Sequence, residues 1–178
     1  MIRGATKLAG LAGVVITSAL VGMFVPAGAF AQASWESLLD RLVGRWTMTG
    51  TVRGEPASYT LTGTRTLEGR FVELHMKDVH VPPAYEARVL IGCDSTGHRV
   101  LAHWMDSFGA AYSVPHGTGV IHGDTLELLF PYADGPFRDR FTYDRRRDAW
   151  RFLLESADSS GAWGEFASYD VRRAKSRR

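Results

Sequence analysis

The sequence contains a single cysteine, Cys93, among 178 residues. No internal disulfide can form, even in an oxidising compartment. Cys93 lies in an apolar strand pattern with Val89 and Ile91, which predicts a buried, unreactive thiol. Because no cysteine follows the apolar run near the N-terminus, attachment of a lipid to a new N-terminal cysteine is also excluded.

Motifs for several kinds of chemistry are missing. There is no Gly-x-Ser-x-Gly nucleophile elbow and no phosphate-binding glycine motif. Histidines are more numerous, but side chains share a face of a strand only at even separations. His75 and His80 are five apart, as are His98 and His103, so neither pair can hold a metal from one regular strand. We therefore predict no metal site within a single strand. A metal site with ligands from different strands is left open.

Excess positive charge is missing from the body of the chain. Of 21 Lys and Arg residues, two lie within 1–33 and five within 172–178, which leaves 14 against 19 Asp and Glu, about −5. An acidic body predicts no binding to nucleic acid. We interpret the basic C-terminus as a solvated tail, with contact to a partner or to anionic lipid as the alternative.

The N-terminus has the features of a secretory signal peptide. Arg3 and Lys7 precede an apolar run at 8–25 that Pro26 ends, and small-x-small sites allow cleavage after Ala31 or Ala33. We predict a signal peptide at 1–33, a secreted or periplasmic protein, and no integral membrane span after cleavage. The run is long for a signal peptide, so an uncleaved membrane anchor is the alternative.

A short helix is expected next. Ser34 is a suitable N-cap, and an apolar stripe with helical spacing follows. Its members are Trp35, Leu38, Leu39 and Leu42. Gly44 ends the helix, and a strand then places Trp46, Met48, Gly50 and Val52 on one face. A large aromatic residue at this position can plug one end of a closed barrel.

The rest of the chain alternates apolar and polar residues with a period of two, separated by turn residues. The predicted strands are 57–67, 70–77, 84–93, 99–106, 110–121, 124–130, 137–143, 149–156 and 164–172. About ten short strands without helices between them predict an all-β, antiparallel up-and-down β-barrel at 34–173, followed by a basic tail at 174–178. A two-sheet β-sandwich is the alternative.

Several short motifs, in this order and spacing, resemble a known family. They are Leu42-Val43-Gly44-Arg45-Trp46, Thr62-Gly63-Thr64, Leu67-Glu68-Gly69-Arg70-Phe71-Val72, Gly92-Cys93-Asp94, Trp104-Met105-Asp106-Ser107 and Tyr169-x-x-Arg172. Together they resemble the bacterial domain-of-unknown-function family fifteen-seventy-nine, regarded as lipocalin-like (calycin-type) barrels. The resemblance implies no particular activity. It implies a barrel of a class that often holds apolar or haem-like molecules.

Two sets of residues are candidates for a ligand site. An inner wall of Trp46, Met48, Trp104 and Phe152 would contact an apolar ligand, or would simply fill the core. Ionisable residues within apolar strands would orient the ligand if they point inward, or would be solvated if they point outward. This second set is Glu73, His75, Glu86 and Arg88.

Three functions remain open from the sequence. The first is binding of a small, mostly apolar molecule inside the barrel, without a required cofactor, although haem is a possible ligand. The second is an enzyme that uses Glu73, Glu86 or His103 as an acid or base. The third is an interaction or envelope-structural barrel with a filled core. The sequence leaves the oligomeric state open.

Overall fold

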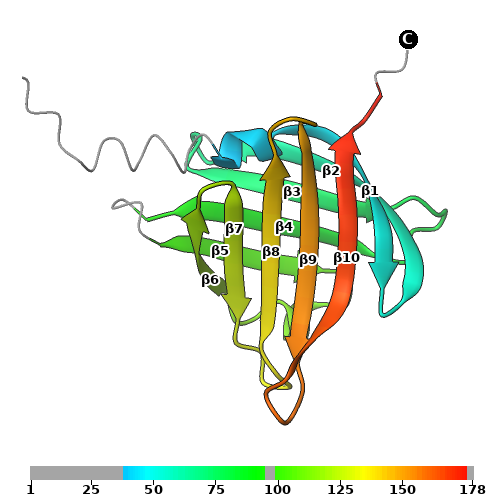
Figure 1. The fold of residues 1–178 in the computed structure, drawn as a ribbon, viewed down its shortest axis with the longest axis vertical. Helices are drawn as coiled ribbons and strands as arrows, with labels where there is room; N and C mark the ends of the chain where they lie inside the picture. Colours follow the sequence, from blue (N-terminus) through cyan, green and yellow to red (C-terminus); the bar gives the residue numbers. More distant parts are fainter. Residues whose placement is uncertain (1–37, 95–98, 176–178) are drawn as a thin grey trace, which may run out of the picture.

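The computed structural model describes residues 38–94 and 99–175. Ten strands form one closed antiparallel barrel, and a short helical segment at 38–42 precedes them (Figure 1). The strands are β1 (Gly44–Val52), β2 (Glu55–Thr66), β3 (Phe71–Asp78), β4 (Glu86–Cys93), β5 (Val100–Asp106), β6 (Gly117–His122), β7 (Thr125–Phe130), β8 (Phe137–Asp144), β9 (Ala149–Ala157) and β10 (Trp163–Arg173).

Strands that follow one another in the chain are neighbours in the barrel. The barrel closes where β1 pairs with β10, with Trp46 opposite Arg173 and Val52 opposite Ala167. This up-and-down order confirms the predicted barrel and excludes the two-sheet sandwich. Closure leaves no free sheet edge at either end of the strand order.

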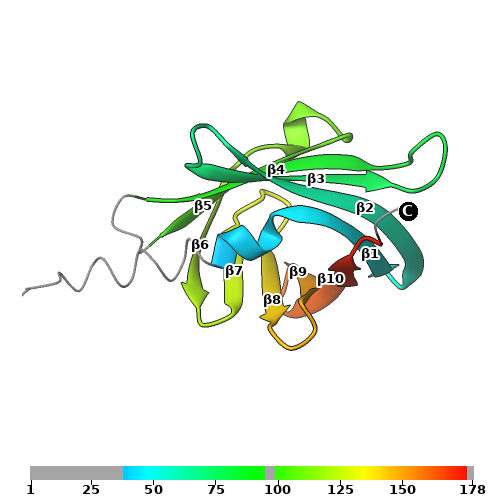
Figure 2. The ribbon, with the colours of Figure 1, turned by 90° about the horizontal axis from the view of Figure 1, so that it is seen from above.

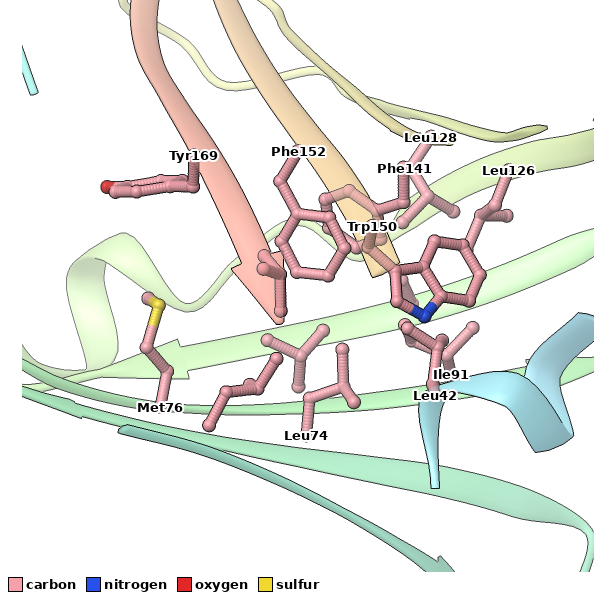
Figure 3. Close-up of a cluster of buried hydrophobic side chains, with 14 of the residues drawn as sticks. Leu42, Leu74, Met76, Ile91, Leu126, Leu128, Phe141, Trp150, Phe152 and Tyr169 are labelled. Atoms are coloured by element: carbon pink, nitrogen blue, oxygen red, sulfur yellow. The ribbon is translucent and has the colours of Figure 1, made fainter. Parts of the chain in front are cut away.

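Alternation along each strand decides which side chains fill the barrel. In β1, Trp46 and Met48 are buried while Thr47 and Thr49 are exposed, as the sequence pattern predicts. The same alternation in the other strands packs one continuous apolar core, and Figure 3 shows part of it. Cys93 lies at its edge, half-buried and packed against the core.

One end of the barrel, here called the plugged end, is covered by the helical segment (Figure 2). The predicted stripe residues Leu38, Leu39 and Leu42 are buried there. The Trp46 Nε1–H donates a hydrogen bond of 2.9 Å to the Leu42 carbonyl oxygen. The guanidinium of Arg173 stacks 3.7 Å from the Trp46 ring centroid. The indole therefore anchors the helix as well as filling space beneath it.

Gly63 in β2 allows the plug to sit this close. A Cβ at this position would collide with the main-chain carbonyl of Leu42. Gly44, with a φ of 129°, ends the helical segment and starts β1 in a conformation that other residues rarely adopt. The chain can therefore turn from the plug directly into the barrel wall.

The predicted strand at 110–121 is wrong in its first half. Residues Ala110–Tyr112 form a single 3₁₀ turn, and β6 begins only at Gly117. Gly109 has a φ of 100°, and Pro115 has no N–H to donate to a neighbouring strand. The connection between β5 and β6 is therefore a long turn, and β6 is a short strand.

The predicted signal peptide at 1–33 and the N-cap Ser34 lie outside the described residues. Within 38–94 and 99–175, no helix is both long and apolar enough to cross a membrane.

Candidate functional site

The barrel interior is almost filled. Its cavity has a volume of about 20 Å³, room for about one water molecule. The cavity is lined by Met48, Leu61, Leu74, Met76, Val89, Trp104, Phe141, Phe152, Leu154 and Tyr169. Figure 3 shows Tyr169 and Met76 at one end of the surrounding cluster, and Trp150 and Leu42 at the other. The lumen is therefore apolar along most of its length.

The four predicted wall residues all point inward. Met48, Trp104 and Phe152 line the cavity, whereas Trp46 lies beneath the helical segment at the plugged end. The structure thus brings three of the four together around one space and assigns the fourth to the plug.

The four predicted ionisable residues lie on the outer face of β3 and β4. Leu74 between Glu73 and His75 is only 2% exposed and occupies the lumen, so its two neighbours point away from it. The prediction that these four residues line the lumen is therefore corrected. Their side chains lie on the solvent-facing side of the barrel wall, which is the alternative given above. The four form two cross-strand pairs, since His75 Nε2 lies 2.6 Å from Glu86 Oε1 and Arg88 pairs with Glu73.

The described histidines do not reach the lumen either. Of those in the described part of the chain, His75 is half-buried on the outer face, and His80, His103, His116 and His122 are exposed. The described residues contain no cluster of three or more His, Cys, Asp or Glu side chains that could hold a metal. Because none of the described histidines points into the lumen, none of them could ligate a haem iron there.

The end opposite the plug, here called the unplugged end, carries a polar network. It contains the turns at 79–85, 107–116, 131–136 and 158–162. The Trp104 Nε1–H donates to the Tyr85 hydroxyl at 3.1 Å, and that hydroxyl donates to Asp106 Oδ2 at 3.1 Å. The rings of Tyr59 and Tyr169 pack edge to face, with their centroids 5.7 Å apart. Burial raises the pKa of Tyr85 and Tyr169 well above the usual tyrosine range.

Asp139 is the exceptional member of this end. It lies in β8 on the inward face with Phe141 and Tyr143, and it is only 3% exposed. Its Oδ1 is buried without a hydrogen-bond partner. Burial raises the pKa of Asp139 to about 8, because the charged form has lost its hydration. Unpartnered buried acids are rare because they destabilise the folded state.

Two tyrosines connect Asp139 with the rest of the network. Burial raises the pKa of Tyr132 to about 12, with contributions from the negative charges of Asp139 and Asp106. The charge of Asp139 also contributes to the raised pKa of Tyr169, after burial and the charge and hydrogen bond of Tyr59. We define the tyrosine–aspartate cluster as Tyr59, Tyr85, Asp106, Tyr132, Asp139 and Tyr169.

The barrel wall is weakest beside this cluster. β5 pairs with β6 only at 100–102, opposite 117–119, and residues 103–106 are paired on their β4 side alone. We call this stretch the seam. Side chains rather than main-chain hydrogen bonds span it: the rings of Trp104 and Phe130 meet edge to face with centroids 6.3 Å apart. On the outside, the rings of His103 and His116 lie 5.6 Å apart.

The cluster was not among the sequence predictions. Arg138 and Arg140 stand out in the segment 137–143, and both lie on the outer face, where each contacts Glu155. A signal for Asp139 did exist, since strict alternation places it on the same face as Phe141 and Tyr143.

Comparison with known proteins supports the fold. No protein-family model matches the chain, and no curated protein matches it. Its structure is similar to the crystal structure of Rv2717c from M. tuberculosis, with a TM-score of 0.55 and 14% identity, over 78% of this chain and 96% of that one. At this identity the similarity shows the fold alone. The resemblance to the domain-of-unknown-function family stays a prediction.

Proposed function

We propose that this protein is an exported, lipocalin-like carrier that binds a small, mostly apolar molecule inside its barrel. The observation that carries the proposal is the asymmetry of the lumen. One end is sealed by a hydrogen-bonded helical plug, while the other combines a seam in the wall with a buried polar cluster. An apolar space with a few placed polar groups is the usual composition of a small-molecule site.

Binding requires the lumen to expand, because the cavity is about 20 Å³ in this structure. Met48 and Met76 line it, and their unbranched side chains adopt new rotamers more readily than branched ones. Transfer of roughly 250 Å² of ligand surface out of water favours binding by about 6 kcal/mol, which offsets such a rearrangement. The seam provides the access route, since opening it breaks ring contacts and no main-chain hydrogen bonds between β5 and β6 at 103–106.

Uptake of a neutral apolar dye, N-phenyl-1-naphthylamine, tests the proposal. The mature chain should bind one dye molecule saturably, as followed by dye fluorescence and by native mass spectrometry. To test the route, His103→Cys and His116→Cys are combined in a Cys93→Ala background, since the two imidazole rings lie 5.6 Å apart across the seam. Oxidation should slow dye uptake strongly, and reduction of the same sample is the matched control.

These measurements test the carrier function and the access route through the seam separately. Absence of saturable binding up to the solubility limit of the dye contradicts the carrier function. Equal uptake rates for the oxidised and reduced protein contradict access through the seam. Export has its own measurement: N-terminal sequencing after expression in a bacterium should give a mature chain that starts at Gln32 or Ser34.

A further inference from the structure

We propose that the tyrosine–aspartate cluster binds the cationic head of an apolar amine, with Asp139 as its counter-ion. This inference rests on the proposed carrier function and specifies the chemical class of the ligand. The apolar part of the molecule would occupy the lumen lined by Met48, Phe141 and Phe152, and its ammonium group would remain at the unplugged end.

Asp139 has an unsatisfied hydrogen-bond acceptor. The residue is only 3% exposed, its side chain points into the barrel, and its Oδ1 accepts no hydrogen bond from any described residue. Its cross-strand neighbours Leu128 and Leu154 are apolar and offer no donor. A ligand that donates a hydrogen bond at this point would remove the penalty of an unpaired buried acceptor.

The side-chain charge around Asp139 is negative. Asp78 and Asp106 lie at the same end, on the inward side of β3 and at the end of β5. Asp78 is paired with His80, and Asp106 accepts hydrogen bonds from the Tyr85 hydroxyl and the Phe108 amide. In the described chain, no Lys or Arg ion pair involves either residue or Asp139. Three carboxyl groups without a Lys or Arg partner, of which only Asp78 has a His partner, favour a cation and oppose a carboxylate.

Aromatic rings gather at the same end of the barrel. Tyr59 packs edge to face against both Tyr85 and Tyr169, with centroids 6.0 and 5.7 Å apart. Tyr132 stacks on Phe130 at 5.9 Å. Aromatic faces attract ammonium groups through their quadrupole, and they do so most strongly where water is excluded. A carboxylate set among tyrosine rings therefore selects an amine over an alcohol of the same length.

Three probes with the same chain test this selectivity: decylamine, decanol and decanoate, each measured by calorimetry and by displacement of the dye. The mature protein should bind decylamine at least about tenfold more tightly than decanol, because a hydrogen bond to a charged group contributes more than a neutral one. Decanoate should bind most weakly of the three. Asp139→Asn should remove the preference for the amine over decanol.

The control variant is Asp170→Asn, the same chemical change at an exposed position on the outer face of β10, where Asp170 pairs with Arg151. It should keep the amine preference of the unsubstituted protein. Equal affinity for decylamine and decanol, or an amine preference that survives Asp139→Asn, overturns the inference while the carrier function stands. If none of the three probes binds and the dye does not bind either, both proposals are wrong.

Discussion

Replacement of Asp139 by Asn should stabilise the protein in a way that depends on pH. The two side chains have nearly the same shape, so the change removes ionisation and preserves packing against Leu128 and Leu154. In the folded protein the pKa of Asp139 is raised by burial to about 8, from an ordinary value of 3.8. The folded state therefore holds this proton more tightly than the unfolded chain does.

These two pKa values set the direction of the stability change and the pH range over which it develops. Below about pH 4 both states are protonated, and Asp139 adds no penalty. As the pH rises from about 4 to about 8, the unfolded state ionises while the folded state does not, so the free energy of unfolding falls. Above about pH 8 the penalty is constant, and at 1.36 kcal/mol per pH unit it amounts to on the order of 5 kcal/mol. Asp139→Asn lacks this contribution at every pH.

Urea unfolding followed by tryptophan fluorescence measures the effect. Titrations of both proteins at intervals from pH 4 to pH 9 should give free energies of unfolding that diverge by on the order of 5 kcal/mol, with most of the change between pH 5 and pH 8. Asp170→Asn, at an exposed ion pair, should track the unsubstituted protein within about 1 kcal/mol. Parallel curves for Asp139→Asn and the unsubstituted protein would refute the burial of an unpartnered acid.

Two further changes test the plug and the outer face. Gly63→Ala places a Cβ against the Leu42 carbonyl and should lower the free energy of unfolding by about 2 kcal/mol in urea titrations, whereas Gly164→Ala meets no atom within 4 Å and should leave it unchanged. Glu73→Gln removes a cross-strand pair outside the lumen, so it should change stability by less than about 1 kcal/mol and should not alter dye uptake. A loss of dye binding in Glu73→Gln would contradict its placement on the outer face.

The barrel could be predicted because its signals are local and repeated. Alternation fixes which residues of a strand share a face, and turn residues separate one strand from the next. The helical stripe ending at Leu42 and the stop at Gly44 likewise depend only on neighbours in the sequence. The wrong prediction at 110–121 has a local cause as well. The apolar residues Val120 and Ile121 suggest a strand that extends toward the N-terminus, but Pro115 has no N–H with which to pair with a neighbouring strand.

The candidate site could not be predicted because it depends on which face of each strand turns inward. In β3, Glu73 and His75 stand among apolar residues, and the inward choice is settled only when Leu74 packs in the closed barrel. In β8 the outcome is the opposite, because the ionisable residue Asp139 shares the inward face with the buried Phe141. The cluster also joins turns and strands far apart in the sequence, and no spacing rule connects them.

The position of Asp139 argues that the unplugged end is not optimised for stability. Its neighbours Leu128, Phe141 and Leu154 are apolar and offer Asp139 no side-chain hydrogen-bond donor. An acid there lowers the free energy of unfolding at neutral pH, by the linkage described above. Local violations of the burial rule are typical of functional sites. Asp139 lies at the end of the barrel where the wall has the fewest main-chain hydrogen bonds between strands. A ligand that enters through the seam and donates a hydrogen bond to Asp139 would satisfy its unpaired Oδ1.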